Sequence, residues 1–171
     1  MPKLILPYCI VLFCSILFSC SKPSPQLPSN KGNVVDKSEL ALVELNQKLV
    51  SKEDSILTKY ASQKDGSFKK SDIGFWYRMD LKTNKDQIKL NDICTLKYKL
   101  MTLDMSILKE EQKEITIGKK QLVVGLEEGL KLLHRGERAT FIIPWNLGYG
   151  RNGLKNIVKP YTSIIYSVEI K

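Results

Sequence analysis

Residues 117–130 read IGKKQLVVGLEEGL, and this stretch decides the fold class. Its leucines recur at four-residue steps, so the pattern predicts one amphipathic helix from about Gln121 to His134. The buried face of this helix would carry Leu122, Leu126, Leu130 and Leu133. Glu127 and Glu128 would face water, and Gly136 lies where a left-handed residue commonly ends a helix.

Extended segments flank this helix on both sides, because their hydrophobic period is two rather than 3.6. Residues 94–100 (CTLKYKL) alternate cleanly, which places Cys94 and Tyr98 on one face and predicts a buried, unreactive thiol at Cys94. Further strands are predicted at 73–79, 138–143 and 163–170. Several strands against one short helix indicate an α+β domain with a mainly antiparallel sheet.

The segment 36–66 has a helical period instead. Asp36 and Glu39 are spaced as in a capping box, which favours a helix start. An apolar stripe follows at helical spacing, formed by Leu42, Leu45, Leu49, Ile56 and Tyr60. This stripe would either pack on its own domain or form a dimer seam, so the oligomeric state stays open. The polar run 51–54 is a place where the helix could be interrupted.

The first 19 residues have the organisation of a bacterial lipoprotein signal peptide. Lys3 supplies the positive end, residues 4–18 are continuously apolar, and Ser19 is the small residue before Cys20. We therefore predict cleavage before Cys20 and lipid on its thiol, which would anchor the chain to a membrane of the bacterial cell envelope, facing the periplasm or the cell surface. The alternative is an uncleaved anchor with Cys20 buried in it.

Residues 20–35 contain Pro23, Pro25 and Pro28 and offer almost nothing to bury. They are predicted to form a flexible tether with a reach of about 40 Å in a polyproline conformation. The folded part would then work at a distance from the membrane.

Composition excludes several classes of function. The 27 basic residues exceed the 18 acidic ones, for a net charge of +9, but they are scattered without a basic run, so a nucleic-acid partner is not expected. His134 is the single histidine, and only Cys20 and Cys94 follow the leader. This leaves no zinc cluster and no Cys–His pair, so we expect no metal and no cofactor.

Residues 148–153 (GYGRNG) satisfy the pattern G-x-G-x-x-G. That pattern holds phosphate only where it joins a strand directly to a helix. Here Pro144, Trp145 and Asn146 intervene after the predicted strand, and an extended run follows. The glycines are therefore expected to permit tight turns in a loop.

Several pieces of sequence occur in order across residues 92–171, and together they resemble the FKBP-type peptidyl-prolyl isomerases. They are the stretch 117–130, RGER at 135–138, IP at 143–144, LGYG at 147–150 and VEI at 168–170. The helical segment, GFWY at 74–77 and the lipid signal further resemble the gliding-motility-associated lipoproteins of Bacteroidetes.

The resemblance implies an FKBP-like antiparallel sheet of five or six strands wrapped on one short helix, with residues 70–171 as the isomerase domain behind the helical segment 36–66. It implies an apolar cleft for proline-containing polypeptides, in which Tyr149, Val123 and Tyr98 would be catalytic. The residues that would bind the substrate are Leu108, Leu122, Leu126, Ile157 and Tyr166. The Tyr149 hydroxyl and the Val123 N–H would hydrogen-bond substrate carbonyls.

Two positions depart from the family pattern. Leu126 replaces the usual indole of the cleft floor, and Lys109 replaces an acidic residue. Both changes could weaken catalysis and still leave proline peptides bound. The predicted function is thus a lipid-anchored prolyl isomerase that assists the folding of exported proteins. The alternative is a weakly active or inactive binding or scaffold module of an envelope or gliding-motility complex.

Overall fold

The structure is a computed structural model that describes residues 37–64 and 67–171 of the 171-residue chain. The predicted signal peptide 1–19, the lipidation site Cys20 and the tether 20–35 lie outside the described residues. Ala41–Lys171 forms one compact unit. Of the other unit, Met1–Leu40, only the first residues of helix α2 are described.

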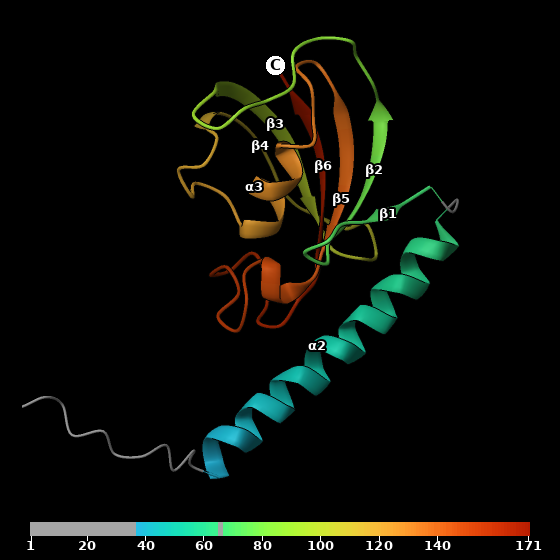
Figure 1. Cartoon of the computed structure of the whole chain (residues 1–171), viewed down its shortest axis with the longest axis vertical. Helices are drawn as coiled ribbons and strands as arrows, with labels where there is room; N and C mark the ends of the chain where they lie inside the picture. The colour runs from blue at the N-terminus through green and yellow to red at the C-terminus, as the bar shows by residue number, and fades with distance from the viewer. Residues whose placement is uncertain (1–36, 65–66) are drawn as a thin grey trace, which may run out of the picture. The chain divides into compact units, whose positions relative to one another are not determined.

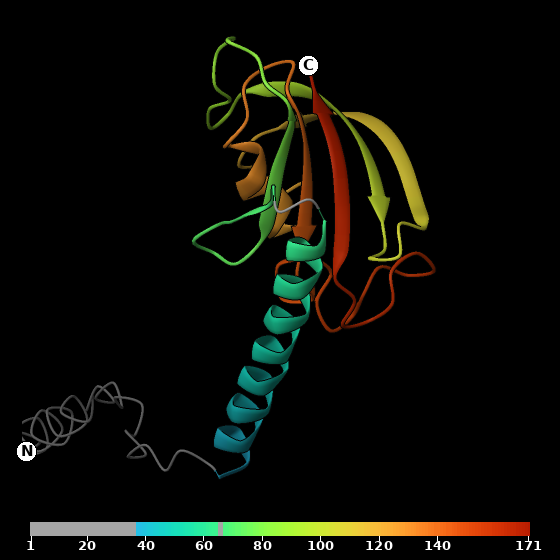
Figure 2. The same ribbon diagram turned by 90° about the vertical axis from the view of Figure 1, so that its right-hand side faces the viewer.

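Six strands form a single antiparallel sheet in the order β1-β2-β5-β6-β3-β4. Their bounds are β1 Lys69–Lys70, β2 Trp76–Leu81, β3 Ile93–Met101, β4 Ile107–Thr116, β5 Arg138–Ile143 and β6 Ile164–Ile170. Figure 2 shows the long strands curving side by side, with β4 at the outer edge. The predicted α+β class and the six-stranded antiparallel sheet are confirmed.

Alternation along the strands gives the sheet two different faces. The inner face packs against helix α3 (Figure 1) and carries the main core. Its fully buried strand residues include Leu96, Leu100, Phe141, Ile143 and Ile164. Cys94 is buried there as a free thiol, and burial raises its pKa, in agreement with the predicted unreactive side chain.

Helix α3 is shorter than the pattern predicts and spans Val124–Leu130. Val123 has an extended backbone, and its carbonyl accepts the N–H groups of Leu126 at 3.1 Å and Glu127 at 3.0 Å, so the helix begins after it. The expectation that Glu127 faces water is wrong, because this side chain is 8% exposed and accepts the Lys120 N–H at 2.9 Å.

Helix α2 runs unbroken over Lys37–Gln63, so the polar run 51–54 does not interrupt it. Its buried residues are Leu57 and Ala61, which pack with Met101, Ile142 and Ile165 into a second cluster on the outer face of the sheet. Most of the predicted stripe does not pack on the domain: Leu42 is 60% exposed and Leu45 is 53% exposed. Across the described ranges, no helix has both the length and the apolar character that a membrane span needs.

Candidate active site

Three tyrosines meet on the inner face of the sheet. Tyr98 on β3 and Tyr166 on β6 are buried, and their rings contact edge to face with centroids 5.4 Å apart. The hydroxyl of Tyr149, from the loop after β5, lies 2.8 Å from the Tyr166 hydroxyl, and either can be the donor. The tyrosines thus link two neighbouring strands to one loop.

The hydroxyls of the two buried tyrosines stay protonated at neutral pH. Burial and the hydrogen bond to Glu111 raise the pKa of Tyr98 to about 12. Burial and the hydrogen bond to Tyr149 raise the pKa of Tyr166 well above its usual value of 10.0. Both hydroxyls are therefore available as hydrogen-bond donors rather than as bases.

The loop that carries Tyr149 is held from both ends. The short 3₁₀ helix η1, Trp145–Leu147, precedes it, and the Gly150 N–H donates to the Trp145 carbonyl at 2.8 Å. Gly153 has φ +66, and a Cβ there would collide with the Val158 carbonyl, so only glycine fits this turn. The prediction that the glycines of 148–153 serve turns agrees with this geometry.

Polar contacts also fasten η1 to helix α2. The Ser163 hydroxyl accepts the Trp145 N–H at 3.0 Å and donates to the Glu53 carboxylate. Ser163 is buried, so both contacts lie away from water. Glu53 therefore supports the loop from behind, at a position where the sequence indicated only a possible break.

The start of α3 packs against the same core. Leu122 and Val123 are half-buried and pack on the core, and Val123 is the residue before the first helical turn. The N–H groups at a helix start have no partner within the helix, so the Val123 N–H suits a peptide carbonyl. Leu126 is 0% exposed and lies beneath this surface rather than on it.

A carboxylate that sequence reasoning missed completes the site. The Tyr98 hydroxyl donates to Glu111 at 2.5 Å, and Lys109 pairs with the same carboxylate at 2.7 Å. The hydrogen bond from Lys109 and that from Tyr98 lower the pKa of Glu111 below its usual value, so it stays ionised. Glu111 lies directly opposite Tyr98 in the β3–β4 register. The sequence offered one signal for Glu111: it lies two residues after Lys109, and residues two apart in a strand share a face.

The eight residues that the resemblance pointed to belong to one cluster. Tyr98, Leu126 and Tyr166 are its buried part. Its half-buried part contains Leu108, Leu122, Val123, Tyr149 and Ile157. Leu108 lies on β4 beside the bulge near Met101, and Ile157 comes from the 154–158 turn. All eight residues therefore belong to the main core or pack against it, and the printed contacts join Tyr98, Tyr166 and Tyr149 directly.

His134 takes a structural part. Its N–H donates to Glu137 at 2.8 Å, and its Nδ1 lies 3.4 Å from the same carboxylate. No group of three or more His, Cys, Asp or Glu suited to a metal ion occurs in the described part of the chain. The arrangement is therefore one of apolar surface and hydrogen-bond donors.

Residues 82–171 match the family model for FKBP-type peptidyl-prolyl cis-trans isomerases. The chain belongs to this family. The match covers β3 to β6, α3 and every residue of the cluster just described. It also includes Glu111 and Lys109.

Relatives of this FKBP-type chain include two proteins described as probable FKBP-type peptidyl-prolyl cis-trans isomerases. One, from Haemophilus influenzae, is 26% identical over 149 residues, which is 84% of this chain and 60% of that protein. The other, FkpA from Neisseria meningitidis serogroup B, is 28% identical over 110 residues, 63% of this chain and 40% of that protein. The chain thus spans less than two thirds of either relative.

Solved structures show the same fold. A peptidyl-prolyl cis-trans isomerase from Pseudomonas syringae superposes with a TM-score of 0.62 at 14% identity, covering 72% of this chain and 92% of that one. AtFKBP13 superposes with a TM-score of 0.57 at 15% identity, covering 60% of this chain and 94% of that one. At these identities the likeness shows the fold alone.

Proposed function

We propose that this chain is a peptidyl-prolyl cis-trans isomerase that acts on proline-containing polypeptides. The observation that carries the proposal is the cluster of Tyr98, Tyr166 and Tyr149 within a domain that matches the FKBP family. Rotation about an X–Pro bond has a barrier of about 18–20 kcal/mol, because amide resonance is lost at the twisted midpoint. No acid, base or nucleophile is needed to lower it.

The surface around Tyr149 suits this reaction. Half-buried Leu108, Leu122 and Ile157 offer apolar contact, which disfavours the polarised planar amide relative to the twisted one. When Tyr166 donates to Tyr149, the Tyr149 proton remains for a substrate carbonyl. The Val123 N–H supplies a second donor at the helix start. These donors favour the twisted carbonyl and so the midpoint of the rotation.

A protease-coupled assay on a proline peptide tests the proposed activity. We expect the purified full chain at micromolar concentration to accelerate the cis-to-trans isomerisation of the peptide. Without a catalyst this isomerisation takes tens to hundreds of seconds. A rate equal to background at that concentration rules out isomerase activity.

Tyr149→Phe tests the role of the hydroxyl. Loss of one donor to the twisted carbonyl should lower kcat/KM several-fold, and the protein should stay folded because the ring still packs. The buried Tyr166 hydroxyl loses its partner, which should cost about 1–3 kcal/mol of stability. Tyr161→Phe is the matched control, since Tyr161 is a 48% exposed tyrosine of the same loop region. Equal rates for the wild type and Tyr149→Phe would remove Tyr149 from the mechanism.

A second candidate is a weakly active or inactive binding module. It is favoured by Leu126, which is smaller than an indole and is covered, so a proline ring reaches it only if the residues above it move. Proline-peptide binding in calorimetry without acceleration in the isomerase assay would support this alternative. Binding together with acceleration would support the isomerase.

The lipid anchor is proposed on the sequence pattern around Cys20. Cys20→Ser should move the protein from the membrane fraction to the soluble fraction of cells, because the lipid-bearing thiol is lost. An unchanged membrane fraction would contradict lipidation. With such an anchor, the isomerase would act on exported proteins at the bacterial envelope. The resemblance to gliding-motility-associated lipoproteins supports a place in that setting.

A further inference from the structure

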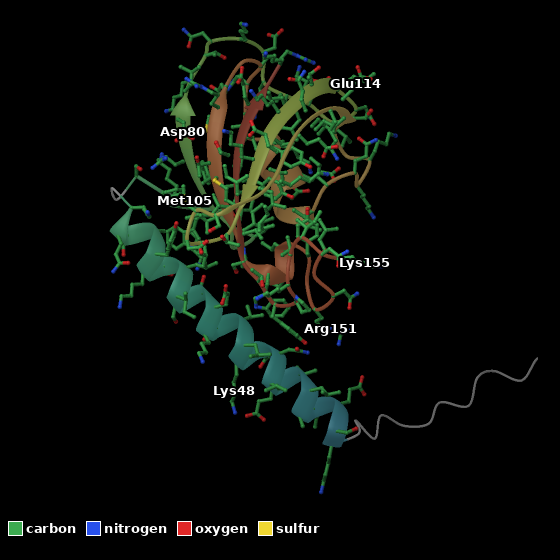
Figure 3. All side chains as sticks on the ribbon, turned by 180° about the vertical axis from the view of Figure 1, so that it is seen from behind. Lys48, Asp80, Met105, Glu114, Arg151 and Lys155 are labelled. Atoms are coloured by element: carbon green, nitrogen blue, oxygen red, sulfur yellow. The ribbon has the colours of Figure 1, made fainter. Side chains whose placement is uncertain are left out.

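A cavity of about 360 Å³ opens on the outer face of the sheet, away from α3 and from the candidate active site. Its walls include Tyr60 at the end of α2 and Met105 in the β3–β4 turn, which meet with the Tyr60 hydroxyl 3.7 Å from the Met105 sulfur. Figure 3 labels Met105 and Asp80, which both line it. The volume lies at the lower end of the range for small-molecule sites.

A polar row crosses the floor of this cavity. The strand register places Arg78 opposite Thr140, Thr140 opposite Ser167, and Ser167 opposite Lys99. Neighbouring strands lie about 4.8 Å apart, so two hydroxyls stand side by side between two cations within about 14 Å. Because all four residues share one face, their side chains point to the same side of the sheet.

An apolar row lies beside the polar one. Met101 and Ile165 are directly paired in the register, two residues along each strand from Lys99 and Ser167. Both line the cavity, together with Phe68. The cavity is therefore amphipathic, with charge on one side and hydrocarbon on the other.

Cations outnumber carboxylates among the residues that line the cavity. Lys64, Arg78 and Lys99 line it, and Asp80 is the one carboxylate among its lining residues. Asp80 accepts from Arg78 Nε at 2.8 Å and from the Thr140 hydroxyl at 2.6 Å. Two further acids lie next to the lining: Glu110 pairs with Lys99, and the charge of Asp104, together with burial, raises the pKa of Tyr60.

The remaining polar groups are only weakly engaged. Lys99 pairs with Glu110 at 3.5 Å through side chains that are 46% and 45% exposed, which contributes little. Lys64 Nζ lies 5.6 Å above the Tyr60 ring. The Ser167 hydroxyl has no hydrogen-bond partner among the residues that the structure describes.

We propose that this cavity binds a small organic anion with an apolar body. A carboxylate or phosphate head would lie on the polar row and accept from Ser167 and Lys99, and the body would pack on Phe68 and Met105, above the buried Ile165 and Met101. This site is separate from the isomerase chemistry and does not rest on it.

Calorimetric titration of the full chain tests the proposal with 4-phenylbutyrate and its uncharged amide, 4-phenylbutanamide. We expect saturable binding of the acid, and an affinity about tenfold or more lower for the amide, because only the charged head engages the row. A third probe, 3-phenylpropyl phosphate, distinguishes the head groups: tighter binding than the acid assigns phosphate esters as the ligand class, and weaker binding assigns carboxylates. Equal affinities for acid and amide would overturn the proposal.

Variants locate the binding. Lys99→Gln should lower the affinity for 4-phenylbutyrate about threefold to tenfold, and Ser167→Ala should also lower it. Lys97→Gln is the matched control, because Lys97 lies on the same strand and face, two residues from Lys99 and outside the cavity. Melting temperatures establish that each variant is folded. An equal loss for Lys97→Gln and Lys99→Gln would show general charge attraction and would refute the site.

Discussion

Tyr98 shows how a single reversed charge is accommodated. The resemblance drawn from the sequence puts Lys109 in the place of an acidic residue, and in the structure the Tyr98 hydroxyl has a carboxylate partner, because Glu111 lies opposite it in the register. Lys109 then pairs with Glu111 instead of opposing it. The reversed charge by itself thus does not leave Tyr98 without an acceptor.

Replacing Glu111 should separate orientation from stability. Glu111→Ala is expected to lower kcat about threefold to tenfold with little change in KM, because Tyr98 loses the acceptor that orients its ring. Glu111→Gln should retain most of the rate, since the amide oxygen still accepts. The carboxylate is 35% exposed, so solvent screening keeps the stability effect small. Steady-state kinetics measure the difference, with Glu114→Ala as the exposed control on β4.

Glu137 is a buried acid whose ionisation stabilises the fold. It is 2% exposed, and its carboxylate accepts the N–H groups of Thr83 at 3.0 Å and His134 at 2.8 Å. Burial alone would raise the pKa of Glu137, but these hydrogen bonds outweigh it and hold the pKa below the usual 4.5. The lowered pKa means that this stabilisation is present above pH 4.5 and is lost as the pH falls through the lower folded value.

The melting temperature of the wild type should therefore fall as the pH drops below about 4.5. Glu137→Gln should be less stable at pH 7, because an amide accepts less strongly, and its melting temperature should fall less steeply with acid. Thermal melts between pH 7 and 3 measure both slopes. Parallel curves for the two proteins would exclude Glu137 as a source of the acid sensitivity.

At the scale of elements, helix α2 is buried only toward its C-terminal end. Leu57 and Ala61, near its C-terminal end, pack against β5 and β6, whereas Leu42, Leu45 and Leu49 remain exposed. A regular apolar stripe predicts a helix correctly, but which part of it is covered depends on where the sheet ends.

Matched substitutions along α2 should show this division. Leu57→Ala removes a side chain that is 1% exposed and should cost about 2–5 kcal/mol in the free energy of unfolding. Leu45→Ala, at a position 53% exposed, should change it by less than about 0.5 kcal/mol. Urea denaturation measures both values. A large loss for Leu45→Ala would indicate that the exposed stripe is covered in solution, as the dimer seam would require.

At the scale of the molecule, α2 and the sheet should unfold together. Both clusters share the sheet, and the Glu53–Ser163–Trp145 contacts join α2 to the loop of the candidate site. A helix without tertiary contacts is marginal in water, so α2 from Glu53 onward should lose its structure when the sheet does.

Coincident transitions would establish this cooperativity. Circular dichroism at 222 nm follows the helices, and fluorescence follows Trp76 in the second cluster and Trp145 in η1. We expect one midpoint in urea for both signals, apart from a gradual loss of the exposed start of α2. Two separated midpoints would show that the helix and the sheet are independent.

Much of the inner face could be predicted from the sequence. The inward positions of Tyr98 and Tyr166 follow from strand alternation, and the buried positions of Leu126 and Leu130 follow from helical spacing. Strand β4 was not predicted as a separate strand, because KEEQKE has no apolar alternation and its pairing with β3 carries it. The site residues Glu111 and Glu53 were missed because the residues that they contact, Tyr98 and Ser163, lie elsewhere in the chain.

The sequence by itself determined the periodicities, and hence the α+β class, the strands β2, β3, β5 and β6 and the inner face, because alternation and helical spacing are local properties of a chain. Only the tertiary structure decided where α3 begins and ends, that Glu127 is buried, and which part of α2 is covered. It also decided that Arg78, Thr140, Ser167 and Lys99 form one row. These outcomes depend on which distant segments meet, and the register between strands is set by the packing of the whole sheet.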